Sequence, residues 1–242
     1  WLLTNGAHLV WAKHEIRWPG SASVIVSLIV LHRGRWTGQV SLNGRDVPGI
    51  GSNLMVESKT GVPSEPYALK SNDSRRSDGI KIQGDGFILT EEERRILLMQ
   101  GQENEAVISR YLTGKDLAQN PLSEPSDWII NFGQMPRSTA ERYRAAFNHV
   151  ETHVKPYRDK LTGQIHESDF WKFWDKRESF FAAMRGQGRI LACPSTAKYL
   201  LMVFVDESLV PSHSVKLFAY SDDESFTTMQ SIVHEVWARQ HS

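Results

Sequence analysis

The sequence predicts a mixed α+β fold in which strands and helices are not arranged as repeated βαβ units. Three observations support this class. Short apolar runs of strand length are bounded by Gly, Pro and Asn turn signals. Two Ser/Thr-x-x-Glu patterns mark helix starts, because such side chains satisfy free N–H groups of a first turn. No internal repeat or low-complexity tract occurs along the 242 residues.

Residues 1–36 predict a helix end followed by strands. The run Val24–His32 has apolar residues on both faces, which favours a central strand buried on both sides. Such a strand requires a partner sheet, and we expect one that lies outside this fragment. In the next segment, Trp36–Val47, the pair Asn43-Gly44 favours the positive φ angles of a two-residue hairpin turn.

Residues 48–82 are rich in Gly, Pro, Ser, Asp and Lys and predict a loop or linker. The segment Gly84–Leu89 predicts a short strand. Thr90 and Glu93 then form the first capping box, so a helix is expected from Glu91 to about Gln100.

The second half of the chain also predicts strands followed by helices. Trp128–Phe132 predicts a buried strand, and Ser138 with Glu141 forms the second capping box, which opens a helix to about His153. Three further strands and a last helix with an apolar face are expected at Arg189–Cys193, Leu200–Val205, Val215–Ala219 and Glu224–Gln240.

Charge is distributed unevenly although its sum is zero. Lys+Arg and Asp+Glu are both 28, but residues 1–135 have a balance of −1, residues 136–198 of +5 and residues 199–242 of −4. The ordinary composition excludes a disordered tail or a histone-like protein. Because the positive charge lies in one stretch, the neutral sum does not exclude a basic face that binds nucleic acid.

Cysteine content and hydropathy indicate the cellular compartment of the protein. The single cysteine, Cys193, allows no disulfide within the chain, and a reducing, cytoplasmic compartment is the default expectation. The longest apolar run, Val24–Leu31, has strand length and is far short of a membrane span. A chain that starts at Trp1 without a signal peptide predicts a fragment of a longer protein.

Two histidines offer one alternative function. His149 and His153 lie four residues apart and would share a helix face, so the alternative function is a metal-dependent hydrolase that also uses a carboxylate such as Glu151. A third ligand is missing from the pattern, and His234-Glu235 lacks the second histidine of a zinc-protease helix because position 238 is Ala. A surface or packing role for the pair is favoured.

The basic stretch contains two segments suited to DNA. Trp171–Arg177 interleaves cations with aromatic rings, so its cations would meet phosphates while the rings anchor the element or stack on bases. The loop Pro194–Tyr199 joins two strands with small polar and cationic groups that could reach base edges. The alternatives are an amphipathic segment with Phe170, Trp171 and Trp174 in the core, an ordinary loop, or a surface that binds another protein.

Several segments in order resemble the large single-chain restriction-modification proteins similar to MmeI and the related DNA adenine methyltransferases. They are Arg17–Val26, Val107–Leu117, Trp128–Gly133, Val154–Arg158, Trp171–Arg177, Arg189–Leu191, Ser195–Tyr199 and Gln230–Arg239.

The resemblance implies that residues 37–242 form a target recognition domain, and that residues 1–36 are the C-terminal strands of a class I methyltransferase domain. It implies double-stranded DNA as a partner, together with the methyltransferase domain upstream in the same polypeptide. S-adenosylmethionine would be the cofactor of the parent enzyme, with an adenine N6 as the acceptor of the methyl group. The family's Asn-Pro-Pro-Tyr motif is missing here, so no catalytic residue and no cofactor are assigned to this chain, and a nuclease domain of the parent stays open.

The resemblance also ranks the DNA contacts. Base contacts are expected from Ser195, Thr196 and Lys198. Contacts to phosphates or bases are expected from Arg189, Arg185, Lys172, Lys176 and Arg177.

Overall fold

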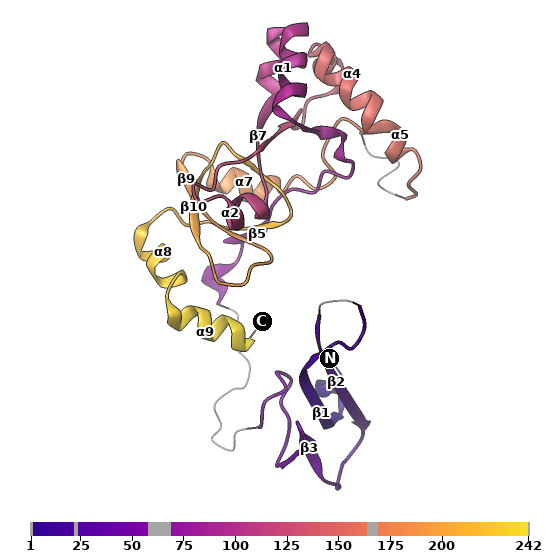
Figure 1. The fold of residues 1–242 in the computed structure, drawn as a ribbon, viewed down its shortest axis with the longest axis vertical. Helices are drawn as coiled ribbons and strands as arrows, with labels where there is room; N and C mark the ends of the chain where they lie inside the picture. Colours follow the sequence, from indigo (N-terminus) through magenta and orange to yellow (C-terminus); the bar gives the residue numbers. More distant parts are fainter. Residues whose placement is uncertain (1, 22–23, 58–68, 164–168, 242) are drawn as a thin grey trace. The chain divides into compact units, whose positions relative to one another are not determined.

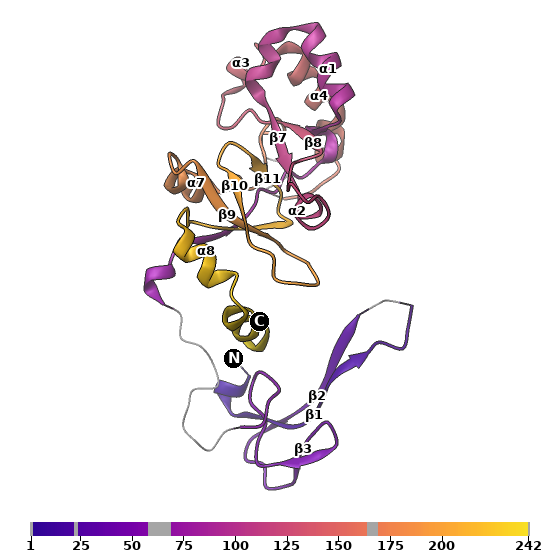
Figure 2. The same ribbon diagram turned by 60° about the vertical axis from the view of Figure 1, so that its left-hand side comes forward.

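The structure, a computed structural model, describes residues 2–21, 24–57, 69–163 and 169–241. The chain divides into a smaller unit of residues 1–68 with 236–242 and a larger unit of residues 69–235. Both contain short strands, and the larger unit contains most of the helices (Figures 1 and 2). The predicted mixed α+β class is confirmed.

The smaller unit is built on one sheet with the strand order β2-β1-β3-β4. Its strands are β1 (Ala7–Arg17), β2 (Ile25–Arg33), β3 (Val40–Leu42) and β4 (Arg45–Val47). β1 pairs antiparallel with β2 and parallel with β3. Leu9, Ala12, Leu42 and Ile50 form its core. The helix end expected near the start is only a 3-10 turn, η1 (Leu3–Asn5), and the residues after it are strand.

β2 is a strand, as predicted, but the predicted burial on both faces is wrong. Among the described residues it pairs only with β1 and lies at the edge of the sheet. Ile25 is 74% exposed, and about half of the surface of Leu28, Ile29 and Val30 is exposed. The smaller unit therefore presents an apolar strand on which both faces are open.

The hairpin predicted at Asn43-Gly44 is confirmed. Leu42 pairs with Arg45 across a two-residue loop, and Asn43 and Gly44 have φ angles of 52° and 79°, as the turn requires. Because β3 pairs with β1, the sheet continues across the predicted boundary at residue 36, and the compact units divide after residue 68. Whether residues 1–36 end a methyltransferase sheet stays a prediction.

The first sheet of the larger unit has the order β10-β9-β12-β5, with every pair antiparallel. The strands are β5 (Arg76–Asp78), β9 (Arg189–Pro194), β10 (Val203–Asp206) and β12 (Val215–Phe218). Three of them confirm predicted strands, whereas β5 lies inside the stretch predicted as loop. Alternate residues of β9 face two cores: Ile190 packs with Phe180 and Met184, and Leu191 packs with Cys193 and Met202.

The second sheet has the order β11-β7-β8-β6. Its strands are β6 (Ile88–Leu89), β7 (Ile108–Leu112), β8 (Asp127–Ile130) and β11 (Val210–Pro211). Its apolar residues form the largest core with helices α1 (Glu91–Gln100) and α4 (Arg144–His153), which Figure 1 shows side by side. The predicted strand Gly84–Leu89 is a 3-10 turn, η3 (Asp85–Phe87), followed by β6.

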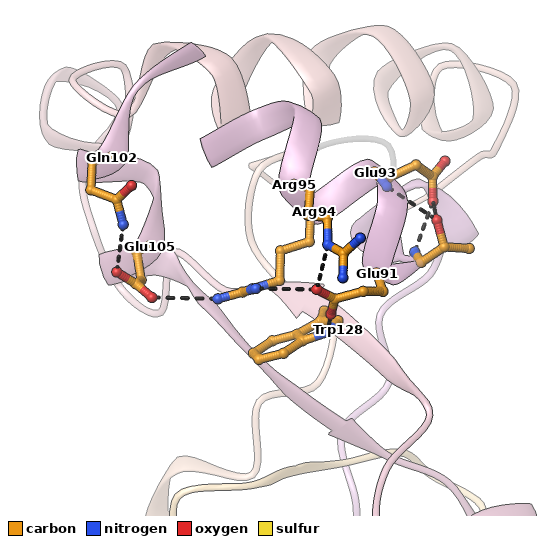
Figure 3. A network of polar contacts seen from close by, with 8 residues as sticks. Glu91, Glu93, Arg94, Arg95, Gln102, Glu105 and Trp128 are labelled. Atoms are coloured by element: carbon orange, nitrogen blue, oxygen red, sulfur yellow. Dashed lines mark hydrogen bonds and ion pairs between the residues drawn. The ribbon is translucent and has the colours of Figure 1, made fainter. Parts of the chain in front are cut away.

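Helix α1 begins as predicted and is tied to the sheet by a polar network (Figure 3). Thr90 and Glu93 form the capping box in both directions. Glu91 accepts a hydrogen bond of 2.7 Å from the Trp128 indole N–H, and the Arg94 guanidinium lies 3.9 Å from the centre of the same ring. This hydrogen bond lowers the pKa of Glu91.

The second predicted capping box is wrong. A short helix α3 (Arg137–Ala140) begins after Pro136, which makes no side-chain cap, and α4 starts separately at Arg144. Glu141 instead pairs with Arg137 at 2.7 Å. The N–H of Ala146 in the first turn of α4 is satisfied by the buried Asn104 side chain from another element, at 3.0 Å.

The remaining helices connect or cover these sheets. They are η2 (Lys70–Asn72), η4 (Gln102–Val107), α2 (Gly114–Gln119), α5 (Lys155–Arg158), α7 (Glu178–Met184), α8 (Asp223–Met229) and α9 (Ile232–His241). The last predicted helix is thus two helices. Phe226 and Met229 of α8 pack as expected, whereas Val233 and Val236 of α9 are 76% and 58% exposed. Among the described helices, none is long and apolar enough to cross a membrane.

Candidate functional site

The loop predicted to contact bases, residues 195–199, is an exposed connection between β9 and β10. Its start is fixed by a hydrogen bond of 2.7 Å from the Ser195 N–H to the Ser214 carbonyl. Thr196 and Lys198 are exposed, and the Lys198 ammonium lies 5.0 Å from the centre of the Tyr199 ring. Tyr199 itself is 66% exposed. The Ser195 hydroxyl donates to the His213 carbonyl at 3.4 Å. The loop presents hydroxyl, ammonium and aromatic groups to solvent at the end of β9.

Arg189 stands at the other end of β9 and is already engaged. Its guanidinium donates to Asp223 and to the Ser221 carbonyl, each at 2.8 Å, and lies 3.8 Å from the centre of the Phe204 ring. The six steps from Arg189 to Ser195 span about 20 Å of extended chain, at about 3.3 Å per residue. The structure thus assigns Arg189 a role in anchoring α8 to the sheet and does not bring it near the loop.

The aromatic-basic segment Trp171–Arg177 supports the packing interpretation for its rings. Trp171 and Phe173 are buried in the largest core, and Trp174 is half-buried. Two of its cations are paired locally: Lys172 with Asp169 at 2.7 Å and Arg177 with Asp175 at 3.2 Å. The rings anchor the segment, and they are not available to stack on bases.

Two predicted cations, Lys176 and Arg185, line one pocket of 540 Å³ in the larger unit, here called the cationic pocket. Other polar groups in its lining come from Ser109, Asn131, Gln134, Glu178, Glu207 and Ser208. Apolar surface comes mainly from Ile80, Phe173, Phe181, Leu209 and Val210. Pockets of this size, largely apolar with a few placed polar groups, are typical of small-molecule sites.

The charges in the cationic pocket are unequally available. The Lys176 ammonium donates to Gln134 Oε1 at 2.8 Å, and burial together with the nearby Lys172 lowers its pKa. Arg185 has no hydrogen bond or ion pair with any described residue. The Glu207 carboxylate accepts from the backbone N–H groups of Gly186, Gln187 and Gly188 at 2.9–3.2 Å. Among the described residues, no carboxylate lies within ion-pair distance of Lys176 or Arg185, although Glu178 and Asp169 act on Lys176 from further away.

The polar residues Asn131, Gln134 and Glu178 were not predicted as site residues. The available signal is that Asn131 and Gln134 follow the buried strand β8, a position where side chains often meet at a sheet edge. Glu178 begins α7 and carries no such signal in the sequence.

The histidine pair predicted for the hydrolase alternative lies together as expected. The rings of His149 and His153 stack with centres 4.3 Å apart, and they line a second pocket of 470 Å³ with Asp85, Glu93 and Tyr157. No group of three His, Cys, Asp or Glu residues suited to a metal ion occurs in the described part of the chain. Glu151, the expected carboxylate, lies within 4 Å of Arg137 and Lys155. These findings do not favour the hydrolase.

Burial makes His149 a source of pH-dependent stability. Desolvation, with a smaller contribution from His153, lowers the pKa of His149 below its ordinary value near 6.5. The unfolded chain then binds the proton more readily, so stability is full above pH 6.5 and falls as the pH drops from there to the folded pKa. We expect the midpoint of urea unfolding to change less between pH 7 and pH 5 in His149→Gln than in the wild type. His213→Gln, at a histidine outside this pair, is the control, and an unchanged slope in His149→Gln would contradict the assignment.

Comparison with known proteins yields a fold likeness. No protein-family model matches the sequence, and no curated protein matches it. A solved structure of the type IIL restriction-modification enzyme MmeI in complex with DNA aligns with a TM-score of 0.69 at 17% sequence identity. The alignment covers 99% of this chain and 33% of that chain, so this chain spans a third of the other's length. The resemblance expected from the sequence is confirmed as a shared fold.

Proposed function

We propose that this chain recognises a specific sequence in duplex DNA on behalf of a DNA adenine-N6 methyltransferase of a restriction-modification system. The observation that carries the proposal is the fold shared over 99% of the chain with MmeI, a restriction-modification enzyme solved with DNA. The exposed loop 195–199 supports it, because Lys, Ser and Thr side chains can donate to base edges in the major groove.

In this proposal, Ser195, Thr196 and Lys198 contact bases, while Lys176 and Arg185 contribute to phosphate binding. Arg189, Lys172 and Arg177 are less favoured as contacts because local partners already hold their charges.

The proposal places methyl transfer elsewhere in the parent protein. This chain matches a third of the MmeI chain, and the catalytic motifs, S-adenosylmethionine binding and any nuclease are assigned to a preceding segment. The exposed apolar faces of β2 support a contact with that methyltransferase domain, since an edge strand invites pairing with another sheet. A cytoplasmic location follows from this assignment and stays a prediction.

Lys198→Ala tests the loop. Selection of bound duplexes from a randomised DNA pool, followed by sequencing, measures the preferred sequence of the wild-type chain. We expect the variant to lose preference at one base pair by about 5- to 150-fold, since one base contact contributes about 1–3 kcal/mol of discrimination. Lys160→Ala, at an exposed lysine outside the loop, should leave the preference unchanged.

Two outcomes would contradict the proposal. If Lys198→Ala selects the wild-type sequence with wild-type strength, the loop does not contact bases. If the wild-type chain shows no salt-sensitive binding to any duplex, the protein-interaction alternative replaces DNA recognition, because phosphate contacts make DNA binding strongly dependent on salt.

A further inference from the structure

The cationic pocket contains an unusual set of free hydrogen-bond donors. The Asn131 amide oxygen accepts from the Gly133 N–H at 2.9 Å, and the Gln134 amide oxygen accepts from Lys176 at 2.8 Å. Both amide NH₂ groups are thereby left without a partner among the described residues. With Lys176 and Arg185, the pocket offers four donor groups to a ligand rich in acceptors.

The two carboxylates that line the cationic pocket differ in their capacity to accept hydrogen bonds from a ligand. Glu207 is engaged by three backbone N–H groups of residues 186–188, which take up most of its acceptor capacity. Glu178 has no hydrogen bond or ion pair with a described residue, and its carboxylate is free to accept from a ligand. A ligand that fits therefore combines an anionic group with at least one N–H donor.

The apolar part of the pocket adds a third requirement. Phe173 and Phe181 line it beside Ile80 and Val210, so part of the ligand is apolar or aromatic. A volume of 540 Å³ accommodates a group the size of a base with its sugar phosphate. A free inorganic anion would leave this surface unused, and a purely apolar ligand would leave two cations unpaired.

We propose that the cationic pocket binds a single nucleotide, with its phosphate at Lys176 and Arg185 and an amino-bearing base at Glu178, Asn131 and Gln134. The base rests against Phe181, the half-buried ring of the pocket lining. The Glu178 carboxylate can accept from the amino group of cytosine or adenine, and the two free amide NH₂ groups can donate to acceptor atoms on the same base edge. Thymine has no amino group, so these two bases fit better than thymine. The nucleotide is either free or part of a DNA strand, and the chemistry recognised is the same.

The inference does not rest on loop 195–199, which lies at the opposite end of β9. It deepens the proposed function only if the nucleotide belongs to DNA. In that case the pocket holds a nucleotide displaced from the duplex, a step that is easiest at a mismatched or unpaired base.

Titration of the full chain with mononucleotides tests the pocket. Binding of dAMP, dCMP, dTMP, 2′-deoxyadenosine and inorganic phosphate is measured by calorimetry, and the contacted residues by NMR shifts of backbone amides. We expect dAMP or dCMP to bind at least tenfold more tightly than dTMP, deoxyadenosine or phosphate. The largest shifts should lie at residues 131–134 and 176–185.

Single variants distinguish recognition of the phosphate from recognition of the base. Arg185→Gln should weaken dAMP at least tenfold and leave deoxyadenosine unchanged, because it removes a phosphate contact. Glu178→Gln should reduce the preference for dAMP and dCMP over dTMP. Its binding of dAMP should still be tighter than its binding of deoxyadenosine. Arg142→Gln, at an exposed arginine outside the pocket, is the matched control. The wild-type fold of each variant is checked by its amide spectrum.

Failure of this inference is distinguishable from failure of the proposed function. Equal, very weak binding of all five compounds, or shifts outside the pocket, would overturn the nucleotide site even if duplex binding through Lys198 persists. Tight dAMP binding without any duplex binding would support the pocket as a site for a free nucleotide and overturn DNA recognition. A duplex with one unpaired adenine that binds more tightly than the paired duplex, in an Arg185-dependent way, would place the nucleotide in DNA.

Discussion

Replacing Arg158 with Met is expected to lower the free energy of unfolding of the larger unit by about 3 kcal/mol or more. The side chain is 2% exposed and its guanidinium donates to four backbone carbonyls. These belong to Ile82, Gln83, Asp169 and Lys172. Each buried acceptor that loses its donor costs about 1–3 kcal/mol, and Met supplies no replacement.

The arrangement explains why arginine stands at this position. Burial lowers the pKa of Arg158 to about 10, so the group stays protonated at neutral pH and all its donors remain available. Lysine would concentrate three donors at one atom and could not reach all four carbonyls on the two segments 82–83 and 169–172. We therefore expect Arg158→Lys to recover only part of the loss.

Hydrogen exchange of amides in β8 and α4 measures this prediction within the larger unit alone. Arg142→Met, at an exposed arginine between α3 and α4, is the control and should change stability by less than about 0.5 kcal/mol. An Arg158→Met variant with wild-type protection would show that the four carbonyls find other donors at little cost.

Local signals in the sequence predicted local structure well. The Thr90–Glu93 capping box and the Asn43-Gly44 turn depend on residues within four positions of each other, and both formed as expected. Ser138 and Glu141 show the same spacing and failed, because Glu141 pairs with Arg137 and the chain turns after Ala140. The start of α4 is instead stabilised by Asn104, 42 residues away, which no local pattern reveals.

Long-range pairing also limited the prediction of the site. Lys176, Arg185 and Arg189 were predicted as one group of DNA contacts, and the structure places only Lys176 and Arg185 in the lining of one pocket. Arg189 is held by Asp223, 34 residues later, and its charge is engaged there. β5 was missed because its three residues, Arg76–Asp78, are polar and become a strand only by pairing with β12.

Asn104→Leu is expected to destabilise the larger unit by about 2–5 kcal/mol. Asn104 is fully buried and joins two elements: its amide N–H₂ donates to the Gly101 carbonyl at 2.6 Å, and its oxygen accepts from the Ala146 N–H at 3.0 Å. Leu keeps the branched shape of Asn with the same number of side-chain heavy atoms, but its methyl groups are bulkier. A buried carbonyl and a helix N–H lose their partners, and some overpacking is added. Both losses fall where α4 meets η4.

Thermal unfolding, with hydrogen exchange at the first turn of α4, measures the effect. Asn148→Leu, at an exposed position on the same helix, is the matched control and should leave stability within about 0.5 kcal/mol. Exchange at Ala146 should rise more than exchange at residues of β9, since the lost hydrogen bond protects that amide directly. Equal protection at Ala146 in Asn104→Leu and in the wild type would mean that Asn104 does not cap α4, and that the interrupted helix is held by its apolar face alone.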